Sequence, residues 1–121
     1  MKDYNRRVIA YIVGRLLSSR AATSVYDYAT SRHHSIEGEV SDRRVNVFDH
    51  ERKRLVSGNG NGQSIALFEI GGSQFIHLEF DLLEFRGFDY STAGAFSGAV
   101  NGDNVSFFDF LAGQQYHFRI A

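Results

Sequence analysis

The sequence predicts a mainly β fold: about ten antiparallel strands in a meander, closed or folded into two layers, with one amphipathic α-helix at the N-terminus. Three observations predict it. An aromatic-acid pair recurs about every twenty residues, which divides residues 23–121 into five β-hairpin repeats. The composition, with 11 Phe, 6 Tyr and 12 Gly but no Pro, suits strands joined by tight turns. Residues 1–22 instead show helical spacing, and we expect both parts to form a single domain over 1–121.

The N-terminal segment has the pattern of a helix with one apolar face. From Asp3, the predicted N-cap, to about Arg20, apolar side chains recur at intervals of three and four residues: Val8, Ile9, Ile12, Val13, Leu16 and Leu17. We expect this face to cover an apolar face or opening of the sheet. Gly14 and Ser18 lie four residues apart on the opposite face, where small side chains admit a second chain. We therefore predict a self-association face there, with a tolerated surface glycine as the alternative.

Two columns of residues align the five repeats. The first column holds the aromatic-acid pairs Tyr26-Asp27, Phe48-Asp49, Phe68-Glu69, Phe88-Asp89 and Phe108-Asp109. The second column holds Ile36, Val56, Ile76, Phe96 and Tyr116. Each repeat splits into two extended runs, and the predicted turns include Gly58-Asn59-Gly60-Asn61-Gly62, Gly71-Gly72-Ser73 and Asn101-Gly102-Asp103-Asn104.

The first strand of each repeat is apolar on both faces and therefore needs a covering layer on each side. Ten strands are near the upper limit for an open sheet before it curls or splits. We therefore expect a closed or nearly closed meander, or two packed sheets. The third repeat is the most apolar and is predicted to lie in the middle of the core, through Phe75, Leu78, Phe80, Leu82, Leu83 and Phe85.

The repeat motif is clearest in Phe88-Asp89-Tyr90 followed by Phe96-Ser97-Gly98-Ala99-Val100-Asn101-Gly102. It resembles that of certain small bacterial proteins, which carry the same hairpin several times after a short N-terminal helix. The resemblance covers residues 24–121 and implies a β-repeat fold and a bacterial source. It implies no activity and no functional residues. The third repeat departs from the motif, with Glu69 in place of Asp and Leu78 in place of Gly.

The repeated acids are the strongest candidates for chemistry: Asp27, Asp49, Glu69, Asp89 and Asp109. A carboxylate that occurs once per repeat is most simply explained by a local need, because at a strand end it accepts hydrogen bonds from turn N–H groups. Equivalent positions two strands apart in a flat sheet are roughly 10 Å apart, too far to share an ion. We therefore predict structural turn acids, with no metal, no cofactor and no catalytic role.

The absence of Cys excludes disulfides, thiolate metal sites and a cysteine nucleophile. The five histidines are His33, His34, His50, His77 and His117. His77 and His117 share a column but are separated by about 19 Å in an open sheet, so they meet only across a tightly closed barrel. A zinc site needs three or four converging ligands, and none is predicted.

Two basic clusters, Arg43-Arg44 and Arg52-Lys53-Arg54, suggest phosphate contacts. In a meander they fall at opposite ends of the sheet, which disfavours nucleic acid as a partner. The glycine-rich segment at residues 58–62 is not a phosphate loop, because no Lys-Ser/Thr and no helix follow it.

The apolar run at residues 8–13 follows Lys2, Arg6 and Arg7 and faintly resembles a signal peptide, but Arg15 and Arg20 interrupt the pattern. A transit peptide is the second interpretation, since residues 4–26 contain Arg and no acid. The run is too short to span a bilayer. We read it as part of the fold and expect a cytoplasmic protein.

Charge is split along the chain. Residues 1–54 carry 11 Lys and Arg against 7 Asp and Glu, whereas residues 55–121 carry 2 against 7. This split, the Gly14 and Ser18 face and the edge strands of an unclosed meander favour a non-catalytic structural or interaction module that forms a homo-oligomer. The alternative is a β-barrel that binds a small apolar ligand in an aromatic interior. An enzyme is a third reading and requires convergent polar groups that the repeats do not suggest.

Overall fold

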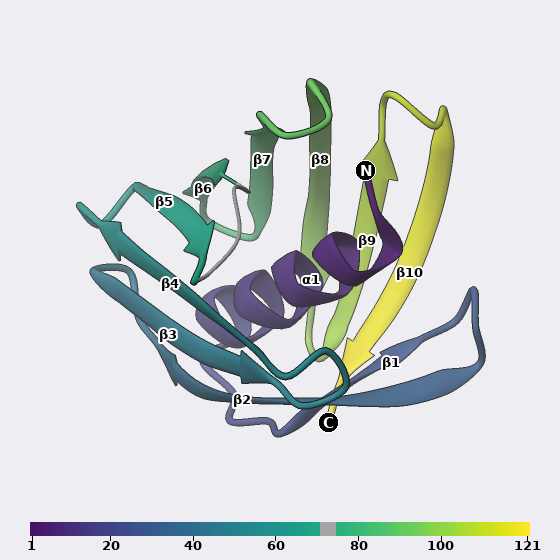
Figure 1. Ribbon diagram of the computed structural model, residues 1–121, viewed down its shortest axis with the longest axis horizontal. Helices are drawn as coiled ribbons and strands as arrows, with labels where there is room; N and C mark the ends of the chain where they lie inside the picture. Colours follow the sequence, from purple (N-terminus) through teal and green to yellow (C-terminus); the bar gives the residue numbers. More distant parts are fainter. Residues whose placement is uncertain (71–74) are drawn as a thin grey trace.

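The computed structural model describes residues 1–70 and 75–121 and contains one helix inside a ten-stranded antiparallel sheet (Figure 1). Helix α1 spans Asp3–Ser18. The strands are β1 Ser24–Asp27, β2 Arg32–Val40, β3 Arg44–Asp49, β4 Arg54–Gly60, β5 Ser64–Glu69, β6 Phe75–Asp81, β7 Glu84–Asp89, β8 Gly94–Asn101, β9 Asn104–Asp109 and β10 Gln114–Ile120. The predicted meander of hairpins with one N-terminal helix is therefore confirmed. The predicted turn at Gly71-Gly72-Ser73 lies outside the described residues.

The sheet closes into a barrel, because its first and last strands pair. In the β1–β10 pairing, Val25 lies opposite Ile120 and Asp27 lies opposite Phe118. The backbone N–H groups of Thr23 and Ser24 donate to the carbonyl oxygen of Ala121. Each strand thus has two neighbours, and the described sheet presents no edge of the kind that recruits another strand.

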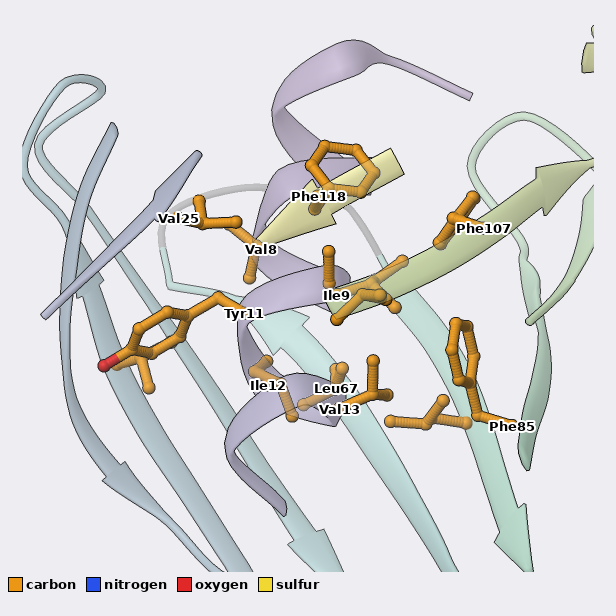
Figure 2. Close-up of a cluster of buried hydrophobic side chains, with 14 of the residues drawn as sticks. Val8, Ile9, Tyr11, Ile12, Val13, Val25, Leu67, Phe85, Phe107 and Phe118 are labelled. Atoms are coloured by element: carbon orange, nitrogen blue, oxygen red, sulfur yellow. The ribbon is translucent and has the colours of Figure 1, made fainter. Parts of the chain in front are cut away.

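Helix α1 runs through the interior of this barrel instead of covering it from outside (Figures 1 and 2). Every residue from Arg7 to Gly14 is buried, so all faces of its middle turns are enclosed. The predicted packing of the Val8, Ile9, Ile12 and Val13 face against an apolar face of the sheet is present, but the opposite face of the helix is enclosed as well. The reason is geometric: side chains alone fill a barrel of about eight strands, whereas a wider barrel needs more material inside. Helix α1 supplies that material.

Gly14 is one of the points of closest approach between α1 and the barrel. A Cβ atom built on Gly14 would lie 2.7 Å from a side-chain methyl carbon of Ile120 and 3.2 Å from one of Val105. The Ser18 hydroxyl donates to the Gly14 carbonyl at 2.5 Å. The predicted self-association face at Gly14 and Ser18 is therefore wrong, because the glycine faces β9 and β10 and not an open surface.

The core forms between α1 and the inward side chains of the strands (Figure 2). The rings of Phe96 and Phe107 stack at 5.1 Å, and Phe85 lies 6.0 Å from Phe107. These rings come from three consecutive strands, β7, β8 and β9. The prediction that the third repeat lies in the middle of the core holds for Leu78 and Phe85, which are buried. It is wrong for Phe75, Leu82 and Leu83, which are exposed large apolar side chains.

The glycine-rich segment at residues 58–62 is only partly a turn. Strand β4 continues to Gly60, and the turn lies between it and Ser64. A Cβ atom on Gly58 would lie 2.6 Å from the Ala66 carbonyl oxygen, and one on Gly60 would lie 2.3 Å from that of Asp42. These two glycines are therefore explained by close backbone approach.

Candidate functional site

The five repeated acids gather at one end of the barrel, where β1, β3, β5, β7 and β9 end; we call it the acid end. Each is at most 7% exposed, and each falls at an inward position of its strand: four lie two residues beyond a buried side chain, and Asp89 lies four residues beyond Phe85. They are Asp27, Asp49, Glu69, Asp89 and Asp109. Strand alternation therefore turns all five carboxylates toward the barrel interior.

The four aspartates organise the turns that follow them. In each, Oδ1 accepts from the backbone N–H two residues ahead: Asp27 from Ala29, Asp49 from Glu51, Asp89 from Ser91 and Asp109 from Leu111. Asp49 and Asp109 also accept from the residue three positions ahead. This is the Asx-turn geometry that a strand-end aspartate adopts. Glu69, the departure from the motif, instead pairs with Arg52 of the neighbouring hairpin.

The first turns of α1 bring positive charge into this ring of acids. The guanidinium of Arg6 lies 3.2 Å from Asp109 Oδ2, and the amino group of Met1 lies 3.4 Å from the same atom. Arg7, which is 6% exposed, lies 4.0 Å from Asp27 Oδ2. The amino-terminal end of a helix also carries a partial positive charge. The acid end therefore holds the start of α1 electrostatically, in addition to the apolar packing.

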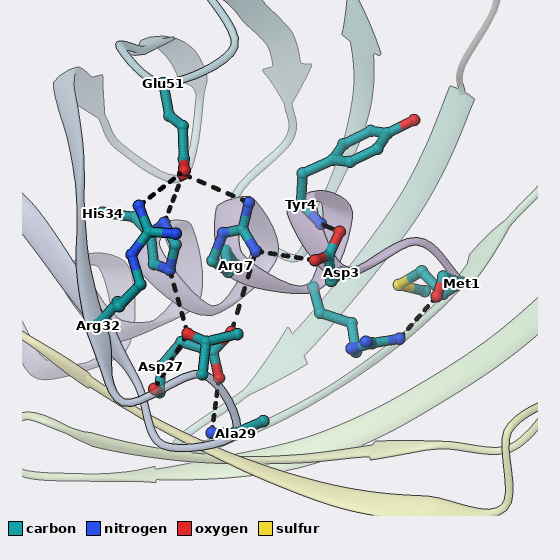
Figure 3. A network of polar contacts seen from close by, with 11 residues as sticks. Met1, Asp3, Tyr4, Arg7, Asp27, Ala29, Arg32, His34 and Glu51 are labelled. Atoms are coloured by element: carbon teal, nitrogen blue, oxygen red, sulfur yellow. Dashed lines mark hydrogen bonds and ion pairs between the residues drawn. The ribbon is translucent and has the colours of Figure 1, made fainter.

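Glu51, in the turn after β3, joins this network from above α1 (Figure 3). Its carboxylate lies 3.6 Å from the Arg7 guanidinium, 3.1 Å from that of Arg32 and 2.5 Å from Nδ1 of His34. The hydrogen bond with His34 is the largest cause that holds the pKa of Glu51 below its ordinary value of 4.5. The positive charges of Arg7 and Arg32 add to it.

Sequence reasoning did not find Glu51, His34 or Arg7 as a group. They come from the turn after β3, from β2 and from α1, and only the interior position of the helix brings them together. His34 lies within β2 and is 3% exposed.

Asp89 is the exception in the ring. Its Oδ1 accepts from the Ser91 backbone and hydroxyl, but its buried Oδ2 has no hydrogen-bond partner. The ion pairs found in residues 1–70 and 75–121 do not include Asp89. The helix therefore balances the charge of the ring on the Asp109 and Asp27 sides and not at Asp89.

The remaining histidines do not converge. His50 pairs with Glu37 at 3.0 Å and His77 with Glu79 at 3.3 Å. Within the described residues, no group of three His, Cys, Asp or Glu side chains has the geometry to hold a metal ion. The two basic clusters lie at opposite ends, since Arg44 begins β3 and Arg52 follows its end.

Exposed large apolar side chains gather at the two ends of the barrel. Those at the acid end are Tyr28, Phe68, Ile70, Phe75, Tyr90, Phe110 and Leu111. Those at the opposite end are Leu82 and Leu83, in the turn between β6 and β7. At the acid end they form edge-to-face pairs, such as Phe88 with Tyr90 at 4.8 Å and Phe108 with Phe110 at 4.8 Å. The motif explains the arrangement, because its aromatics flank an inward acid and thus point outward.

The opposite end also carries an open groove. This groove holds about 850 Å³ and lies along β5 to β8, where Glu79, Asp81 and Glu84 provide three acids and Asn61, Gln63 and Ser64 provide polar groups. Arg86 also lines it and pairs with Glu79 at 3.0 Å. We refer to it as the acidic groove.

No family model, curated protein or solved structure matches this chain. In the described residues, no helix is long and apolar enough to cross a membrane. The strand-end carboxylates were the strongest candidates for chemistry in the sequence. In the structure they accept hydrogen bonds from turn N–H groups and form ion pairs with α1.

Proposed function

We propose that the protein is a non-catalytic interaction module that self-associates through the two ends of its barrel. One observation carries the proposal: the exposed large apolar side chains of the described residues all lie at these ends. A contiguous exposed apolar surface on a folded domain typically marks an interaction site. The acids that suggested catalysis are committed to turns and ion pairs. Closure of the sheet removes edge strands as the route of association.

Size-exclusion chromatography with light scattering over a range of concentrations tests self-association. We expect a mass that rises above the 13.6 kDa of one chain as concentration rises. The double variant Leu82→Ser with Leu83→Ser removes two exposed apolar side chains at the end opposite the acids and should shift association to higher concentration. His117→Ser, on the outer face of β10, is the control and should behave as the wild type. A 13.6 kDa species at every concentration would contradict the proposal.

A small apolar ligand in the interior has less support. The barrel that this alternative requires is present, with a buried cluster of phenylalanines, but α1 occupies its interior. The apolar recess between α1 and strands β4 to β6, lined by Val8, Ile9 and Leu67, holds only about 10 Å³. Ligand pockets of drug-sized molecules typically hold roughly 300–1,000 Å³. An apolar ligand would have to displace the helix.

A further inference from the structure

The tip of the β6–β7 hairpin has the sequence Asp81-Leu82-Leu83-Glu84, which differs from that of the equivalent turn one repeat later. That turn, between β8 and β9, is Asn101-Gly102-Asp103-Asn104. Gly102 has φ of 64°, a conformation that costs glycine nothing. Leu82 holds the corresponding position with φ of 56°. A bulky side chain in this region of backbone space is a true outlier. Leu82 is 86% exposed, so packing does not offset the strain.

The same tip carries a repulsive pair of charges. Asp81 and Glu84 lie directly opposite each other in the β6–β7 pairing. Like charges at opposed positions destabilise a hairpin. Both side chains are exposed, and the ion pairs within the described residues include neither of them. Both line the acidic groove together with Glu79.

Three unfavourable features thus meet at one exposed tip: a strained leucine, a second exposed leucine and a like-charge pair. Departures from the local rules of folding concentrate at functional sites. A partner that brings positive charge next to apolar surface would relieve the repulsion and cover the leucines. The acidic groove has the volume to admit side chains as long as lysine or arginine.

The β3–β4 turn at the acid end presents that chemistry. Lys53 and Arg54 are exposed, and the ion pairs of the described residues include neither, whereas the neighbouring Arg52 is held by Glu69. Apolar surface adjoins this basic turn, because the N–H of the 47% exposed Ile70 donates to the Leu55 carbonyl of β4. Positive charge and an exposed apolar side chain therefore lie at the same end of the barrel, on neighbouring hairpins.

We propose that the acidic groove of one copy binds the β3–β4 turn of a second copy, head to tail. Lys53 and Arg54 of the second copy face Asp81 and Glu84, and Leu82 and Leu83 pack beside its Ile70. This inference rests on the proposed self-association and names its interface. The groove of each copy binds one neighbour, and its β3–β4 turn binds another. The contact is therefore heterologous and builds a ring or an open chain of copies.

A charge-exchange experiment tests the pairing. Asp81→Lys with Glu84→Lys makes groove and turn both basic, and Lys53→Glu with Arg54→Glu makes both acidic. We expect each variant alone to associate at least about tenfold more weakly than the wild type, because like charges then meet. An equimolar mixture should recover association, since each groove again finds a turn of opposite charge. Arg119→Glu, a charge reversal on the outer face of β10, lies away from both surfaces and should associate as the wild type does.

The outcomes separate the two proposals. If the wild type stays monomeric at every concentration, self-association fails and this interface fails with it. If the wild type associates but neither charge variant weakens it, only the interface is wrong. If both variants weaken association and the mixture does not recover it, the groove does not bind this turn. Carbodiimide crosslinking of the wild type provides a measurement that needs no variant: the interface predicts intermolecular bonds from Lys53 to Asp81 or Glu84, and their absence in crosslinked oligomers contradicts it.

Discussion

The guanidinium of Arg6, on the first turn of α1, lies 3.2 Å from the buried carboxylate of Asp109, at the end of β9. The same guanidinium lies 3.9 Å from the centre of the Tyr116 ring. Asp89 has the equivalent place in the preceding repeat, yet its Oδ2 has no hydrogen-bond partner. The two carboxylates thus have the same role in their turns, but α1 provides an ion-pair partner for Asp109 and none for Asp89.

This contrast predicts different costs for one isosteric change. Asp109→Asn keeps an oxygen for the turn N–H groups but removes the negative charge that Arg6 faces, so we expect a loss of about 2–4 kcal/mol in the free energy of unfolding. Asp89→Asn removes a buried charge that has no cation, and we expect a change of less than about 1 kcal/mol. Urea denaturation measures both. Equal losses would mean that α1 contributes nothing to the ring of acids.

Gly14→Ala tests the interior position of the helix through the sign of its effect. In an exposed helix this change stabilises by about 1 kcal/mol. Against Ile120 and Val105 the added methyl group is overpacked, which typically costs about 1–3 kcal/mol. We therefore expect net destabilisation in thermal or urea unfolding. Ser18→Ala, in the last turn, is the control and should cost less than about 1 kcal/mol.

Acid should weaken the network around Glu51. The pKa of Glu51 in the folded protein is lowered, first by the hydrogen bond with His34. A lowered pKa contributes stability that is fully present above the unfolded value, near 4.5, and is lost as the pH falls through the folded value. Urea midpoints should therefore fall below about pH 4.5, and Glu51→Gln should flatten that part of the profile. An unchanged profile in Glu51→Gln would contradict this role, and Glu37→Gln on the outer face is the matched control.

Leu82→Gly separates the stability of one chain from association. Glycine relieves the strain at φ of 56°, so we expect the free energy of unfolding to rise by about 1 kcal/mol. The same variant loses an exposed apolar side chain of the proposed interface and should associate more weakly. Differential scanning calorimetry of a dilute sample and light scattering of a concentrated one measure the two effects. A destabilised Leu82→Gly monomer would mean that the leucine serves the fold of its own chain.

The parts of the fold that local patterns determine were predictable from sequence. The spacing of Asp49, Asp89 and Asp109 predicted both the hairpins and the turn role of the acids, because alternation and Asx-turns act within a few residues. The place of α1 was not predictable in this way, since it depends on the circumference of the closed sheet. Arg7 shows the consequence: it is buried inside the barrel, and its side chain reaches the acids at the barrel end.

The contact among Glu51, His34 and Arg7 was missed for the same reason. It joins three elements that meet only when the helix lies in the barrel. The tip at Leu82, in contrast, was visible as an irregularity of the third repeat and was misread as core. Leucines in a two-residue connection between strands lie at the hairpin tip, whatever their hydrophobicity.

The pairing of β1 with β10 also governs when this protein can fold. Partners such as Val25 and Ile120 are separated by almost the whole chain, so the barrel cannot close on the ribosome until the last residues have emerged. Until then, the apolar residues of α1 lack the strands β8 to β10 against which they pack. Contacts of such long sequence separation slow folding. A newly made chain therefore depends on its final strand to enclose its first helix.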